Sequence, residues 1–144
     1  MFLLQMMDTG YEFFEHTADV GLRATGRTLE ELFVQVARGL THLLVEDGEI
    51  RPQETREVTL RADSAQHLLW AWLKAVLDWF NTDRFLVADC RLDVGSTELR
   101  GRVLGERFDP NRHAAGTEVK GVTHHQFTVE QTPRGWQARI IFDV

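Results

Sequence analysis

Two stretches with apolar residues at helical spacing constrain the fold of this 144-residue chain more than any other feature. The first helix is predicted to begin at Thr28, because Thr28 and Glu31 have the spacing of a capping box. Gly48 and Pro52 mark the predicted end of this helical segment. The apolar positions between these signals share one helix face: they are Leu29, Leu32, Phe33, Val36, Ala37, Leu40, Leu43 and Leu44.

The second helix is predicted to follow Ser64, a residue type suited to the N-cap position. Its wide apolar stripe consists of Leu68, Leu69, Trp72, Leu73, Val76, Leu77 and Phe80. Trp70 and Trp79 fall off this stripe. They either cover neighbouring elements or form an aromatic patch for a partner, since aromatic residues are enriched at interfaces. The sequence leaves both interpretations open.

Segments with β-strand character surround the helices, at residues 11–16, 20–25, 56–61, 85–94, 97–108, 119–131 and 136–144. The turn sequence Thr132 to Gly135 predicts an antiparallel hairpin between the last two strands. The order of elements lacks the regular βαβ alternation of a doubly wound fold. We therefore expect an α+β fold, with two α-helices packed on one face of a mostly antiparallel β-sheet. A single domain is expected over residues 1–144, with residues 1–9 as a frayed N-terminal extension.

Composition narrows the classes of function. Sixteen basic residues against twenty-two acidic ones give a net charge of −6, which argues against strong direct binding of nucleic acid. A protein, a small molecule or a cation is the expected partner. No apolar run approaches the ~20 residues of a membrane span. The single cysteine, Cys90, cannot form an internal disulfide and is compatible with a reducing cytoplasm, which is the predicted location.

Two acidic residues near opposite ends of the sequence are the leading candidates for a site. Asp19 follows a short apolar-rich stretch, and Asp143 closes an alternating strand. If the first and last strands pair, both carboxylates come close to the terminal carboxylate of Val144. Oxygen donors of this kind suit a hard cation such as Ca²⁺ or Mg²⁺. Ordinary roles also remain open, namely a turn or cap for Asp19 and a salt bridge for Asp143.

Other polar residues allow two interpretations each. His16 is either a buried, hydrogen-bonded histidine or a residue that holds a carboxylate in place. Lys120 is either a surface lysine or part of a site, because it precedes Gly121, where a backbone can approach closely. The polar loop from Gly105 to Gly116 is expected to be functional or mobile. It contains Glu106, Asp109, Asn111 and His113.

Several reaction signatures are missing from the sequence. It has no Cys-x-x-Cys or His-Glu-x-x-His pattern, no glycine-rich nucleotide loop and no Gly-x-Ser-x-Gly element. Cys90 lies within a predicted strand, where a packed and inert thiol is expected. These observations argue against an independent nucleotide-hydrolysing or acyl-transfer enzyme.

The motifs of this chain, in their order and spacing, resemble those of the archease family. The matching segments are 11–21 (YEFFEHTADVG), 26–33 (GRTLEELF), Gly105-Glu106 with His113, 118–125 (EVKGVTHH) and 141–144 (IFDV). The resemblance covers nearly everything from Tyr11 to the last residue. The chain departs from the family pattern at three positions. His124 replaces the usual tyrosine, Gly121 a common alanine and Val144 the usual isoleucine.

The resemblance implies a function that composition does not show. Archeases are accessory factors, and not themselves enzymes, of the GTP-dependent tRNA-splicing RNA ligase. They promote guanylylation of the ligase and support multiple turnover. The expected partner is therefore this RNA ligase, in tRNA splicing or RNA repair. A stand-alone metal-dependent phosphodiester or nucleotide hydrolase is the alternative, and a general interaction module or chaperone is a third interpretation.

The resemblance also implies site residues. It implies a divalent cation, with calcium the expected ion, bound by Asp19, Asp143 and Val144. The same functional surface is expected to include His16, Glu106 and Lys120.

Overall fold

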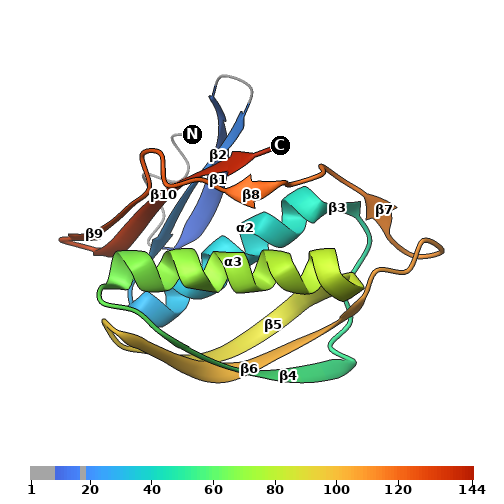
Figure 1. Ribbon diagram of the computed structural model, residues 1–144, viewed down its shortest axis with the longest axis horizontal. Helices are drawn as coiled ribbons and strands as arrows, with labels where there is room; N and C mark the ends of the chain where they lie inside the picture. Colours follow the sequence, from blue (N-terminus) through green and yellow to red (C-terminus); the bar gives the residue numbers. More distant parts are fainter. Residues whose placement is uncertain (1–8, 17–18) are drawn as a thin grey trace.

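The computed structural model describes residues 9–16 and 19–144 (Figure 1). The predicted extension over residues 1–9 therefore lies, apart from residue 9, outside the described residues. The elements are β1 (Gly10–His16), β2 (Asp19–Gly26), α2 (Leu29–Leu44), β3 (Val45–Asp47), β4 (Glu54–Arg61), α3 (Ala65–Asp83), β5 (Phe85–Val94), β6 (Glu98–Arg107), β7 (Ala114–Ala115), β8 (Gly121–Val122), β9 (Thr128–Thr132) and β10 (Gly135–Asp143).

The two described helices lie between two antiparallel sheets (Figure 1). In the larger sheet the strand order is β1-β2-β10-β8, with β9 also paired to β10. In the other sheet it is β4-β6-β5, and β3 and β7 form a short separate pair. Helix α2 contacts both β2 and β5, while α3 contacts β5, β8 and β9. The predicted α+β class is thus confirmed, and its strands are divided over sheets on both sides of the helix layer.

Both predicted N-caps are present. The Thr28 hydroxyl accepts a hydrogen bond from the Glu31 N–H at 3.2 Å. The Glu31 carboxylate accepts from the N–H of Arg27 at 2.6 Å, so the reciprocal bond reaches one residue before the cap. In α3, the Ser64 hydroxyl accepts from the His67 N–H at 3.1 Å. These bonds satisfy N–H groups that a helix start otherwise leaves unpaired.

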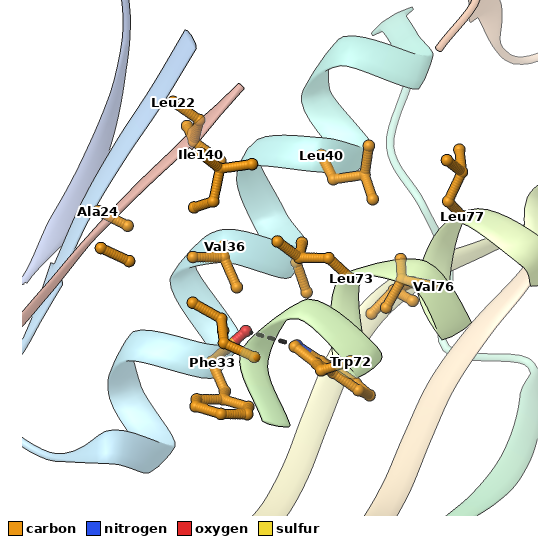
Figure 2. Close-up of a cluster of buried hydrophobic side chains, with 14 of the residues drawn as sticks. Leu22, Ala24, Phe33, Val36, Leu40, Trp72, Leu73, Val76, Leu77 and Ile140 are labelled. Carbon is orange, nitrogen blue, oxygen red and sulfur yellow. Dashed lines mark hydrogen bonds between the residues drawn. The ribbon is translucent and has the colours of Figure 1, made fainter. Parts of the chain in front are cut away.

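The core fills the space between the sheets and the helices (Figure 2). It joins Leu22, Ala24 and Ile140 of the larger sheet to Phe33, Val36 and Leu40 of α2 and to Trp72, Leu73, Val76 and Leu77 of α3. The Trp72 indole N–H donates to the carbonyl of Phe33 at 2.9 Å, which links the two helices inside the core. This bond satisfies a buried polar group and fixes the position of α3 along α2.

The two tryptophans outside the predicted stripe cover neighbouring elements, as one of the two interpretations expects. Trp79 packs edge-on against Trp72 and Phe85, with ring centroids 6.2 and 5.9 Å apart. Trp70 stacks on His124, with ring centroids 4.5 Å apart. Both tryptophans are partly buried against the core.

The predicted strand over residues 119–131 is wrong in one respect. It is divided into β8 and β9 by a turn in which Gln126 has a φ of 52°. Both pieces pair with β10, so the segment follows that strand and leaves it only between Thr123 and Phe127. Within this excursion the His124 ring stacks on Trp70 of α3.

Candidate functional site

The strand pairing brings Asp19 and Asp143 together. Asp143 lies directly opposite Asp19 where β10 pairs with β2. His16 of β1 is opposite Asp19 on the other side, and Gly121 of β8 is opposite Asp143. Directly opposed residues of an antiparallel pair share one face, with Cβ atoms about 4.5–5.5 Å apart. We call the Asp19–Asp143 pair the acidic row.

The acidic row lies on the face of the sheet that points away from the helices. Leu22 of β2 and Phe142 of β10 are fully buried toward the core. Side chains alternate along a strand, so Asp19 and Asp143 belong to the opposite face. Asp143 is exposed and Asp19 is half-buried. The alternation noted in the last strand is present in β10, where Asp143 shares the outer face with Arg139.

The neighbours of the acidic row include further predicted site residues. The backbone N–H of Lys120 donates to the carbonyl of Asp143 at 2.7 Å, and the Lys120 side chain is exposed. Val144 follows Asp143 and packs, partly buried, against the core. The backbone of His16 is at the row, but its side chain lies outside the described residues.

The structure does not bring Glu106 to this row. Glu106 belongs to β6 in the other sheet and is only 4% exposed, which corrects the expectation that it lines the same surface. It accepts a hydrogen bond from the Arg51 N–H at 2.6 Å and forms an ion pair with Arg112. The Nε2 atom of His113 lies 3.4 Å from its carboxylate. The sequence does not reveal this location, because the backbone N–H that donates to Glu106 belongs to Arg51, which is distant in sequence.

The loop after β6 is held in place by this network. Burial alone would raise the pKa of Glu106, but the hydrogen bonds from Arg51 and Arg112 and the charge of Arg112 outweigh it and lower that pKa. The buried His113 ring accepts from the Asp109 N–H at 2.9 Å through Nδ1, and its Nε2 lies 3.0 Å from the Glu49 carbonyl. The polar loop expected to be functional or mobile is therefore braced by buried bonds.

Cys90 has the properties expected of an inert thiol. Burial, and secondarily the charge of Asp89, raises the pKa of the Cys90 thiol to about 12. The thiol is therefore protonated at neutral pH, and a protonated thiol is a poor nucleophile and metal ligand.

The chemistry of the acidic row fits a hard divalent cation. Two carboxylates held directly opposite each other repel, and a cation bound between them removes this repulsion. The main-chain oxygen of the adjacent Val144 would add an oxygen donor of the kind that Ca²⁺ prefers. Within the described residues, no group of three His, Cys, Asp or Glu side chains forms a ready metal cluster. Binding at this row would therefore need main-chain oxygens in addition to the two carboxylates.

A search for membrane-spanning elements gave a negative result. Among the described residues, no helix combines the length and the apolar character that crossing a membrane requires.

Comparisons with known proteins identify the family. The archease protein family model matches residues 11–144. The "Protein archease" of Sulfurisphaera tokodaii is 32% identical over 93% of this chain and 98% of its own length. That of Saccharolobus solfataricus is 35% identical over the same shares.

Solved structures show a similar fold. The solution structure of a Methanobacterium thermoautotrophicum protein superposes with a TM-score of 0.82, at 29% identity over 94% of this chain and 99% of that one. A Thermotoga maritima crystal structure, described as an archease and possible chaperone, gives a TM-score of 0.63 at 21% identity, over 91% of this chain and 94% of its own. The family match and the identities over most of the chain lead to one conclusion: this chain belongs to the archease family.

Proposed function

We propose that this protein is a metal-binding accessory factor of the GTP-dependent tRNA-splicing or RNA-repair ligase, which promotes guanylylation of the ligase and its multiple turnover. The observation that carries the proposal is the register that sets Asp143 opposite Asp19 on an exposed sheet face. Family membership supplies the context for this pair, because the same two positions fall in the opening and closing motifs of the sequence.

Each residue at the row would have a separate role. Asp19 and Asp143 would hold a divalent cation, with calcium the expected ion, and an oxygen of Val144 would complete the set on the protein side. When bound, such a cation supplies positive charge where nucleotide phosphates must be positioned. The Lys120 N–H keeps the neighbouring segment against β10 through its bond to Asp143. His16 and Lys120 would flank the cation on the surface that meets the ligase.

The overall charge supports a protein partner over direct binding of RNA. A net charge of −6 favours association with a basic, RNA-binding enzyme, because complementary charge accelerates encounter. The same charge repels the phosphate backbone of free RNA. A localized cation at the acidic row would reverse this repulsion only where a phosphate has to bind.

The test is a guanylylation assay with the purified cognate ligase. We expect the wild-type protein to accelerate transfer of GMP to the ligase histidine, and Asp143→Ala to lose most of this stimulation. Asp93→Ala is the matched control, since Asp93 is an exposed carboxylate on β5 in the other sheet. Absence of any stimulation by the wild-type protein would refute the proposal. Nucleotide hydrolysis without ligase, abolished by Asp143→Ala, would instead support the stand-alone hydrolase.

A further inference from the structure

An aromatic ring lies against the sheet one pair of positions away from the acidic row. Phe14 of β1 is directly opposite Gly21 of β2. Its ring occupies the space that a Cβ atom at Gly21 would need, so it lies over the glycine backbone. Ile141 of β10 is opposite Gly21 on the other side and is fully buried, although it belongs to the outer face. The outer end of the Phe14 ring thus fills the space above Gly21 on this face.

Two guanidinium groups share this ring. Arg23 lies 4.4 Å and Arg139 4.3 Å from the Phe14 ring centroid. The two arginines are directly opposite each other in the β2–β10 pair. Like charges at such positions destabilise a sheet, whereas the face of an aromatic ring attracts each cation by roughly 0.5–1 kcal/mol at an exposed site. The ring therefore stabilises two positive charges that would otherwise repel.

The guanidinium groups are directed toward the acidic row. Arg23 and Arg139 lie one pair of positions beyond Gly21 and Ile141, on the side away from Asp19 and Asp143. Since both groups contact a ring whose outer end lies at Gly21, their side chains extend from positions 23 and 139 toward that position. From Gly21 to Asp19 is two residues, or about 6.6 Å along the strand at ~3.3 Å per residue. One ligand can therefore span the arginine pair and the acidic row.

The positive charge of the pair is incompletely balanced within the described residues. Arg23 Nη1 lies 3.5 Å from a Glu12 carboxylate oxygen. Arg139 Nη2 donates to the side-chain oxygen of Gln126 at 3.0 Å, and this amide is neutral. Two planar guanidinium groups with one nearby described carboxylate are a suitable recognition element for phosphate, which accepts paired N–H donors.

We propose that Arg23 and Arg139, which both contact the Phe14 ring, bind one phosphate group of a nucleotide. The other phosphates of this nucleotide contact the cation at the acidic row. This inference rests on the proposed function and adds a ligand class and an anion-binding pair to it. The protein then contacts GTP itself during activation of the ligase, with negative phosphates between the cation and the guanidinium groups.

The first experiment measures binding of GTP, in the presence of Ca²⁺, to the purified protein by isothermal titration. Arg23→Gln and Arg139→Gln are each expected to weaken GTP binding about tenfold, the usual effect of losing one charge-assisted hydrogen bond. Arg139→Lys, which keeps the charge, should recover part of this loss. Arg91→Gln is the matched control, because Arg91 is exposed on β5 of the other sheet. Ca²⁺ affinity without nucleotide should change less than about twofold in all variants, since none of them removes an oxygen ligand.

GTP affinities of Arg23→Gln and Arg139→Gln equal to that of Arg91→Gln would overturn the inference, as would a wild-type protein that does not bind GTP. The guanylylation assay separates this failure from failure of the proposed function. If both arginine variants stimulate the ligase as strongly as the wild-type protein does, and with the same dependence on GTP concentration, the role of the arginine pair is refuted and the proposed function is not. Loss of stimulation with unchanged GTP affinity would also refute it, and would assign the arginines to contact with the ligase protein. No stimulation by the wild-type protein, with arginine-dependent GTP binding retained, would refute only the role in ligase activation.

Discussion

The acidic row and the Glu106 network show how differently two carboxylate sites can be used in one small domain. Glu106 is 4% exposed and is bonded to the Arg51 N–H and the Arg112 guanidinium. Asp143 is exposed and faces a second carboxylate across the strand pair. The first arrangement satisfies its oxygens with the protein's own donors. The second places two carboxylates side by side, with Asp143 accessible to a ligand from outside.

The largest effect that separates the two sites is expected for cation binding. Asp143→Asn should weaken Ca²⁺ binding by about 100-fold, because ligand charge sets affinity in calcium sites. Without the cation, its free energy of unfolding should change by less than about 0.5 kcal/mol, since an exposed carboxylate and a like-charge contact are removed. Isothermal titration and urea denaturation measure the two quantities. Unchanged Ca²⁺ affinity would show that Asp143 is not a ligand.

The opposite result is expected at the buried carboxylate. Glu106→Gln should lower the free energy of unfolding by about 2 kcal/mol, because Arg112 loses its charged partner and the Arg51 N–H a strong acceptor. Its Ca²⁺ affinity should equal that of the wild-type protein. Urea denaturation at neutral pH provides the measurement, with Glu57→Gln, at an exposed position of β4, as the control. Wild-type stability of Glu106→Gln would show that the network contributes nothing.

The pH dependence of stability sharpens the same contrast. The folded-state pKa of Glu106 is lowered, so the stability it contributes is present above its unfolded-state pKa of about 4.3 and is lost as the pH falls through the folded value. The melting temperature of the wild-type protein should therefore fall more steeply than that of Glu106→Gln below about pH 4.5. Asp83 and Glu98 also have lowered pKa values, and they contribute equally to both proteins. If the melting temperatures of the two proteins fell equally with pH across this range, Glu106 would not be a source of the pH dependence.

The smallest effect is expected at Gly121, opposite Asp143. A Cβ atom there meets nothing within 4 Å. Gly121→Ala should therefore raise the free energy of unfolding by about 0.5 kcal/mol, because alanine lowers the conformational entropy of the unfolded chain. Its effect on Ca²⁺ affinity should be within about twofold, because no ligand changes. Gly21→Ala is the contrasting variant, since its methyl group would displace the Phe14 ring. Thermal unfolding measures both, and a destabilised Gly121→Ala would show a closer contact there.

The sequence was sufficient for elements that depend on nearby residues. Both helices and their caps at Thr28 and Ser64 follow from a local period and from residues three positions apart. The break between β8 and β9 was not predicted, because Gln126, which has a positive φ there, is not a residue type that marks a turn. The β3–β7 pair was also missed, since strands of three and two residues are too short to show alternation.

The candidate site was also predictable only where its features depend on local sequence. Motif resemblance selected Asp19 and Asp143, and alternation along the last strand gave the correct face for Asp143. Glu106 also falls on a motif of the family, but it lies away from the acidic row. Its contacts with Arg51 and Arg112 form only in the folded chain, so the sequence did not reveal them. Arg23 and Arg139 were not selected at all. Their common feature is the Phe14 ring, and only the cross-strand register reveals it.

The position of β10 between β2 and the β8 and β9 strands also sets the order of events during synthesis. Residues 19–26 leave the ribosome early, yet their partner at 135–143 is made more than a hundred residues later. Until then the β1–β2 hairpin carries an unpaired edge and an uncovered apolar face, which are hazards for aggregation. Contacts of such long sequence separation also slow folding. The carboxylate pair therefore cannot assemble on a partly synthesised chain, and a message truncated before β10 yields a product without the acidic row.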